Sequence, residues 1–159
     1  MDDLKIIFLD IDGVLNCEID NPDTRNMRHD ISKRCMELLN DLIESTKSKI
    51  VISSTWRYSK STEELQKIFE DHGFKGKIID RTPRLGADCL RGNEILKWMK
   101  DNDSLIGYHS YYNKYVILDD DSDMLFWQKD NYINVDGYVG LTRKICYKAA
   151  YILNGKYLR

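Results

Sequence analysis

The sequence has little cysteine, little proline and no long apolar segment. It holds four cysteines and two prolines in 159 residues. Because no two cysteines have CxxC spacing and no Cys/His cluster has zinc-ligand spacing, we expect four reduced thiols. No apolar run reaches the roughly 18 residues of a membrane span, and the acidic N-terminus is not typical of a signal peptide. These absences predict a cytoplasmic protein without a membrane partner.

The sequence also lacks a strong charge bias, internal repeats and low-complexity tracts. Its formal net charge is only −2, so overall charge does not favour binding to nucleic acid or membranes. A chain of this length buries roughly 70% of its unfolded surface. We therefore predict a single domain spanning residues 1–159, with oligomeric state left open.

Short apolar segments alternate with helical patterns along the chain. Expected strands cover residues 6–9, 49–53, 77–80, 115–118 and 132–135. Expected helices cover about residues 30–46, 61–72, 93–101 and 142–153. Asp30 or Ser32 could cap the first helix. Alternating strands and helices predict an α/β fold, with a mostly parallel five-stranded sheet and helices on both of its faces.

The first expected strand ends in two carboxylates. Asp10 and Asp12 follow the apolar run 6–9, and Gly13 allows the chain to turn sharply after them. Alone, this pattern is also an ordinary strand followed by a turn. In open parallel sheets, however, ligands bind at the carboxyl ends of the strands.

Two other expected strands end in polar residues that belong to the same edge of the sheet. Ser53 ends the second strand, and an acidic run from Asp119 to Asp123 follows the fourth. Asp10, Asp12, Asp119 and Asp120 would repel one another at close range. A hard cation relieves that repulsion, and an all-oxygen ligand set favours Mg²⁺.

Hydroxyl groups and a cation are needed to hold a phosphate beside such a metal. Ser53 could donate to a phosphate oxygen, with Ser54 or Thr55 as alternatives. Arg91 lies just before an expected helix, where an anion is favoured. Lys97 and Arg84 are the alternative cations, and Arg57 could hold further parts of a substrate.

These motifs together resemble those of the haloacid dehalogenase (HAD) superfamily of phosphohydrolases. The resemblance spans about residues 5–125. Its first motif matches Asp10-Ile11-Asp12-Gly13-Val14-Leu15, its second Ile50-Val51-Ile52-Ser53, its third Arg91, and its fourth Leu118-Asp119-Asp120 with Asp123. The resemblance implies a three-layer Rossmann-like fold. The segments 17–31 and 81–91 leave room for little or no cap domain.

The resemblance also implies an activity. Asp10 would be the nucleophile that forms an aspartyl-phosphate, and Asp12 the general acid and base. Asp10, the backbone carbonyl of Asp12, and Asp119 or Asp120 would hold Mg²⁺. Ser53 and Arg91 would bind the phosphoryl oxygens.

A narrower resemblance concerns the substrate. The segments 52–57, 81–85, 91–95, 117–121 and 140–142 are similar to small HAD domains linked to nucleic-acid repair, including the phosphatase half of polynucleotide kinases. This implies a phosphomonoester substrate such as a nucleic-acid end or a nucleotide. A nucleotidase or phosphotransferase acting on a small molecule, and a non-catalytic binding domain with this fold, remain the alternatives.

Overall fold

The protein folds around a five-stranded sheet. The computed structural model describes residues 4–22, 30–107 and 114–155. The strands are β1 (Ile6–Leu9), β2 (Lys49–Ile52), β3 (Ile78–Arg81), β4 (Tyr115–Asp119) and β5 (Tyr132–Asn134). Their order is β3-β2-β1-β4-β5, and every neighbouring pair is parallel. The predicted α/β fold with a five-stranded parallel sheet is confirmed.

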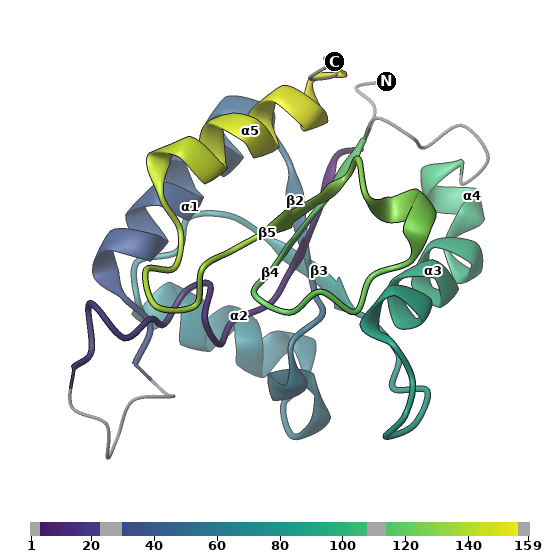
Figure 1. The fold of residues 1–159 in the computed structure, drawn as a ribbon, viewed down its shortest axis with the longest axis horizontal. Coiled ribbons are helices and arrows are strands. Elements are labelled where there is room, and N and C mark those ends of the chain that lie inside the picture. Colours follow the sequence, from purple (N-terminus) through teal and green to yellow (C-terminus); the bar gives the residue numbers. More distant parts are fainter. Residues whose placement is uncertain (1–3, 23–29, 108–113, 156–159) are drawn as a thin grey trace.

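Helices cover both faces of this sheet (Figure 1). The helices are α1 (Lys33–Thr46), α2 (Thr62–Asp71), α3 (Arg91–Asp101), α4 (Asp103–Ile106) and α5 (Arg143–Leu153), with the 3₁₀ segments η1 (Thr55–Tyr58) and η3 (Phe126–Gln128). Apolar side chains of α1, α2 and α5 form one core layer with the sheet. Those of α3 and α4 form a second layer on the opposite face. The result is a three-layer, Rossmann-like architecture.

Strand β1 illustrates why the sequence shows continuous apolar runs. Ile7 and Leu9 face the layer of α1, α2 and α5, whereas Ile6 and Phe8 face that of α3 and α4. All four side chains are fully buried. A central strand covered on both faces needs apolar residues at every position, which removes the alternation seen in half-exposed strands.

Local hydrogen bonds account for most of the helix starts. Ser32, and not Asp30, caps α1 by accepting from the Cys35 amide at 3.2 Å. Ser61 and Glu64 form the capping box that precedes α2. These helix starts follow from short-range sequence signals.

The start of α3 differs from the prediction because its cap is distant in sequence. The helix begins at Arg91, two residues earlier than expected. Leu90 at the N-cap position provides no side-chain hydrogen bond. Instead, Asp123 Oδ2 accepts from the Arg91 amide at 2.9 Å, and the Asp123 backbone carbonyl accepts from the Gly92 amide at 3.1 Å. A Cβ at Gly92 would lie 2.6 Å from the Leu125 amide nitrogen, so glycine permits this close approach. The acidic run after β4 therefore places Arg91.

Two features of the connections bear on access to the sheet edge. The expected flap over residues 17–31 falls partly on residues 23–29, outside the described residues. The segment from Thr82 to Leu90 is a short connection between β3 and α3.

In the part of the chain that the structure describes, no helix combines the length and apolarity needed to cross a membrane.

Candidate functional site

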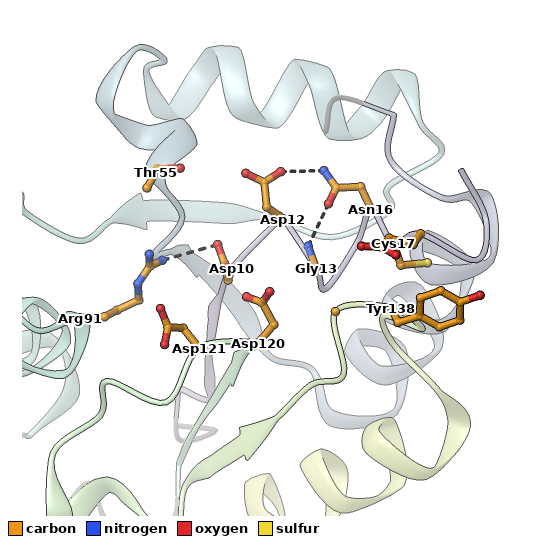
Figure 2. Close-up of a pocket in the computed structure, with 12 residues that line it drawn as sticks. Asp10, Asp12, Gly13, Asn16, Cys17, Thr55, Arg91, Asp120, Asp121 and Tyr138 are labelled. Atoms are coloured by element: carbon orange, nitrogen blue, oxygen red, sulfur yellow. Dashed lines mark hydrogen bonds and ion pairs between the residues drawn. The ribbon is translucent and has the colours of Figure 1, made fainter. Parts of the chain in front are cut away.

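A polar pocket lies where the predicted chemistry converges, at the carboxyl ends of β1 and β4 (Figure 2). Its volume is about 470 Å³. The lining residues are Asp10, Asp12, Gly13, Asn16, Cys17, Glu18, Thr55, Arg91, Asp120, Asp121, Gly137 and Tyr138. Five of these side chains are carboxylates and one is a guanidinium. An anionic substrate would be repelled here unless a cation accompanied it.

Asp10 lies at the centre of the pocket. It follows β1 directly, and its amide donates to the Leu118 carbonyl at 3.0 Å, which extends the ladder with β4. Its Oδ1 accepts from the Ile11 amide at 2.9 Å. The residue is only 6% exposed, so the carboxylate is held firmly in a largely dehydrated position.

Arg91 connects three strand ends. Its Nη1 lies 3.5 Å from Asp10 Oδ1, and its Nε lies 3.5 Å from Asp119 Oδ2. Nη1 also donates to the Ser53 carbonyl. Of the three cations that the sequence offered, the structure brings Arg91 into the pocket. Lys97 pairs with Asp101 on the surface of α3, and Arg84 stacks on Tyr58.

Asp10, Asp119 and Asp120 form a group that could hold a metal ion. One carboxylate oxygen from each lies within 4.8 Å of the others. Asp119 is fully buried, and within the described residues its Oδ2 accepts no hydrogen bond and has only the ion pair with Arg91 Nε at 3.5 Å. A buried carboxylate oxygen with so distant a donor is poorly satisfied, and a hard cation would satisfy it. The donor set therefore fits a cation such as Mg²⁺. The Asp12 side chain does not belong to this group, and the expected role of its carbonyl stays a prediction.

The electrostatics of the group also favour a cation. Burial, followed by the charge of Asp119, raises the pKa of the Asp10 carboxyl to about 8. The positive charge of Arg91 acts in the opposite direction but does not cancel this rise. Burial raises the pKa of Asp119 to about 6, again opposed by Arg91. One guanidinium does not compensate this cluster of carboxylates.

Gly13 allows the turn after β1 to pass close to Asp120. Its φ is +77°, and a Cβ there would lie 2.2 Å from Asp120 Oδ2. The Gly13 amide donates to Asn16 Oδ1 at 3.0 Å, which closes the turn. Glycine is thus required by both the backbone conformation and the adjacent carboxylate.

Asp12 is oriented by two donors that the sequence reasoning did not assign. Asn16 Nδ2 donates to Asp12 Oδ1 at 2.8 Å, and the indole of Trp56 donates to the same oxygen at 3.2 Å. The four-residue spacing of Asp12 and Asn16 within one turn could have suggested the first contact. The second joins residues 44 positions apart and has no local signal.

The three expected hydroxyl donors have different surroundings. Ser53 is fully buried, and its Oγ has no hydrogen-bond partner among the described residues. Ser54 Oγ accepts from the Trp56 amide at 3.3 Å and caps η1. Thr55 lines the pocket. Ser53 and Thr55 are therefore better placed than Ser54 to receive a substrate oxygen.

Arg57 is not brought into the pocket. Its side chain is 2% exposed and forms a buried ion pair with Glu94 of α3. It also donates to the backbone carbonyls of Thr82, Ser53 and Ser54. These contacts hold η1 against α3 and the segment after β3, which leaves the predicted phosphate-binding role without geometric support.

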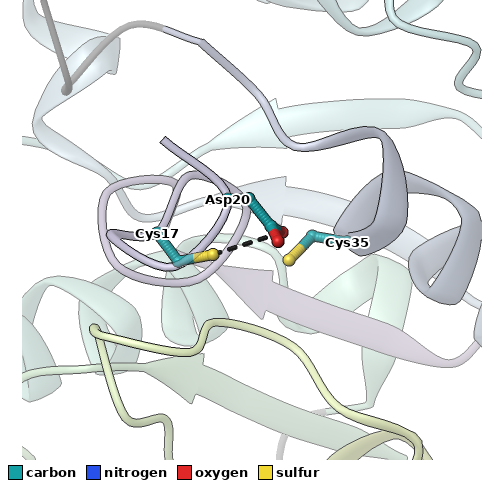
Figure 3. Close-up of side chains that lie close together, drawn as sticks. All are labelled: Cys17, Asp20 and Cys35. Atoms are coloured by element: carbon teal, nitrogen blue, oxygen red, sulfur yellow. Dashed lines mark hydrogen bonds between the residues drawn. The ribbon is translucent and has the colours of Figure 1, made fainter. Parts of the chain in front are cut away.

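A second group of potential ligands lies beside the pocket (Figure 3). Cys17 Sγ donates to Asp20 Oδ2 at 3.4 Å, and Cys35 Sγ completes the group. The Asp20 carboxylate already accepts from Ser32 and from the Arg34 guanidinium. Burial raises the pKa of the Cys17 thiol to about 11, so the sulfur stays protonated. The group acts as an anchor for the turn after β1.

Removing Arg57 should destabilise the fold. Arg57→Met leaves Glu94 as an unpaired buried carboxylate, and breaking a buried pair on one side costs roughly 3–5 kcal/mol. The loss is measured as a lower free energy of unfolding in urea. Arg84→Met, which removes an exposed arginine nearby, is the matched control and should change it by less than about 0.5 kcal/mol. Equal effects of the two substitutions would contradict the structural role of Arg57.

Binding of a divalent cation should depend on pH. The metal-free protein should lose stability as pH rises from about 4 to about 8, because the unfolded Asp10 ionises at a pKa near 3.8 and the folded one only at about 8. Mg²⁺ should therefore raise the melting temperature more at pH 8.5 than at pH 5.5.

Asp10→Asn should reduce this cation effect and flatten its pH dependence, because the ionising ligand is gone. Asp121→Asn removes a pocket carboxylate outside the ligand group and should leave the pH dependence in place. The same cation-induced shift at both pH values, unchanged in Asp10→Asn, would argue against a cation at this group.

Comparison of the chain with known proteins identifies a family that it matches. Residues 6–145 match the model of the HAD domain in Swiss Army Knife RNA repair proteins. No curated protein matches the chain. No solved structure matches it. The family match covers most of the chain and includes every residue of the acidic group and Arg91, so the chain belongs to the family of HAD domains found in Swiss Army Knife RNA repair proteins.

Proposed function

We propose that this chain is a Mg²⁺-dependent phosphatase that removes a terminal phosphate from RNA through an aspartyl-phosphate on Asp10. The observation that carries the proposal is the position of the Asp10 carboxylate. It is buried, 3.5 Å from the Arg91 guanidinium, and grouped with Asp119 and Asp120. Membership of a family from RNA repair proteins supports the reaction class and the type of substrate.

The residues around Asp10 supply what a phosphate needs for binding. A Mg²⁺ ion held by Asp10, Asp119 and Asp120 would neutralise phosphate charge and polarise its oxygens. Arg91 would turn its donors from Asp10 and Asp119 toward the phosphoryl oxygens. The buried Ser53 hydroxyl would gain the hydrogen-bond partner that it lacks among the described residues.

Asp10 would act as the nucleophile. Its carboxylate attacks phosphorus, and the bond between phosphorus and the ribose oxygen breaks as the new bond forms. Asp12 gives its proton to the departing oxygen. Water then attacks the phosphorus of the aspartyl-phosphate, Asp12 takes a proton from that water, and Asp10 is released with inorganic phosphate.

The contacts of Asp12 suggest which of its oxygens moves the proton. Both Asn16 and Trp56 donate to Oδ1. Oδ1 is thereby held as an acceptor, so Oδ2 is the atom that can carry and return a proton. Fixing one oxygen in this way orients the other toward the reacting phosphate.

Phosphate release tests the proposal. The protein with Mg²⁺ should release phosphate from 3′- or 5′-phosphorylated RNA, and EDTA should abolish the release. Asp10→Asn should lower kcat at least about 1,000-fold, because it removes the nucleophile. Turnover of free nucleotides at a higher kcat/KM than RNA ends would favour a small-molecule nucleotidase. No release from any phosphoester by folded, cation-bound protein would favour a non-catalytic binding domain.

Trp56 offers a test of the proton-transfer geometry. Trp56→Phe keeps an aromatic ring but removes the donor to Asp12 Oδ1, so kcat should fall roughly 10-fold through misorientation of the general acid. KM and the cation-induced rise in melting temperature should change little. Trp127→Phe alters an exposed indole outside the pocket and is the matched control. A kcat equal to that of the unchanged protein would contradict the proposed role of Trp56 in orienting Asp12.

A further inference from the structure

The pocket extends well beyond the groups that a phosphate would use. Its volume of about 470 Å³ falls within the roughly 300–1,000 Å³ of small-molecule sites. Arg91 lies on one side of Asp10 and Tyr138 on the other, at the far end of the pocket (Figure 2). A phosphate bound between Asp10 and Arg91 therefore leaves the Tyr138 end for another part of the substrate.

Tyr138 is an exposed aromatic residue on a well-fixed turn. The residue is 57% exposed, although it lines the pocket. Its amide donates to Asp136 Oδ1 at 3.0 Å, and its carbonyl accepts from the Ile19 amide at 3.0 Å. Within the described chain, no side chain stacks on its ring.

The turn that carries Tyr138 is tied to the turn that carries the catalytic aspartates. The Leu141 amide donates to the Val14 carbonyl at 3.0 Å. Arg34 donates to the carbonyls of Val139 and Leu141, each at 2.5 Å. Because both ends of the segment are anchored, the ring is held in a fixed relation to Asp10 and presents a preorganised apolar face.

The charge around this end of the pocket restricts what can occupy it. Glu18 lines the pocket and lies between Cys17 and Ile19, whose amide binds the Tyr138 carbonyl. A second phosphate near Glu18 would be repelled, and no basic side chain other than Arg91 lines the described pocket. An uncharged, flat group fits both the carboxylate and the exposed ring.

We infer that Tyr138 is the stacking platform for the nucleobase of the terminal nucleotide whose phosphate lies at Asp10. The inference rests on the proposed function for the identity of the substrate as an RNA end. Tyr138 thereby recognises a base without reading its identity, since every base presents a π-face. The inference requires the remainder of the strand to leave the pocket into solvent, because its next phosphate would be repelled by the carboxylates.

Binding of an uncleavable RNA tests the inference on the intact protein with Mg²⁺. The probe is a short fluorescent RNA whose terminal phosphate is joined through a methylene group in place of the ester oxygen. Its partner probe is identical but lacks the terminal base. Dissociation constants for both are measured by fluorescence anisotropy.

Tyr138→Ala should weaken binding of the base-bearing RNA by roughly 5- to 150-fold, the range of base–aromatic stacking. Binding of the abasic probe should change by less than twofold. Tyr138→Phe should retain the affinity, because stacking uses the face of the ring. Tyr147→Ala removes a 72% exposed tyrosine outside the pocket and should change neither affinity.

Equal effects of Tyr138→Ala on both probes, or no effect on either, would overturn the inference. A free nucleoside phosphonate that binds as tightly as the RNA would overturn the assignment to an RNA end. The binding assay needs no turnover, so failure of the base-stacking inference can be distinguished from failure of the proposed phosphatase activity. A base-dependent loss in Tyr138→Ala, together with no phosphate release by the unchanged protein, would refute the reaction and support the base site.

Discussion

The main physical constraint on this structure is the crowding of carboxylates at the edge of the sheet. Asp10 and Asp119 are buried at the ends of adjacent parallel strands, with Asp120 beside them. Like charges in a poorly solvated position oppose folding unless a proton, a guanidinium or a metal ion compensates them. Arg91 compensates part of this charge, but burial, followed by the charge of Asp119, still raises the pKa of Asp10. A divalent cation at this group would compensate the remaining negative charge and allow an anionic phosphate to approach.

Two long-range connections hold the groups around this cluster. Asp123, which follows β4, caps α3 and thereby sets the position of Arg91. Arg57 joins η1 to α3 through Glu94, and η1 carries the Trp56 indole that contacts Asp12. The acidic cluster, its guanidinium and Asp12 are therefore positioned by one connected set of hydrogen bonds.

The sequence was sufficient to predict the sheet and the residues at its carboxyl edge, but not the partners of those residues. Strands β1 and β4 are continuous apolar runs that lead into aspartates, which is a short-range pattern. Because the two strands are adjacent and parallel, these aspartates lie close together at one edge of the sheet. The burial of Arg57 could not be predicted, because it depends on Glu94, 37 residues away. The start of α3 at Arg91 and the contact from Trp56 to Asp12 depend on partners 32 and 44 residues away. No sequence pattern marked Tyr138 as a binding residue, because the proposed role depends on the pocket that it lines.

The proposed function requires that Asp10 accept a phosphoryl group beside a bound cation. The most direct measurement is a crystal structure of the protein grown with Mn²⁺ and beryllofluoride, a mimic of the phosphoryl group, with anomalous diffraction to locate the metal. We expect beryllium bonded to an Asp10 carboxylate oxygen and fluorine atoms within hydrogen-bond distance of Arg91 and Ser53. We expect Mn²⁺ to contact Asp10 and at least one of Asp119 and Asp120. Beryllofluoride on another residue, or Mn²⁺ bound away from this group, would contradict it.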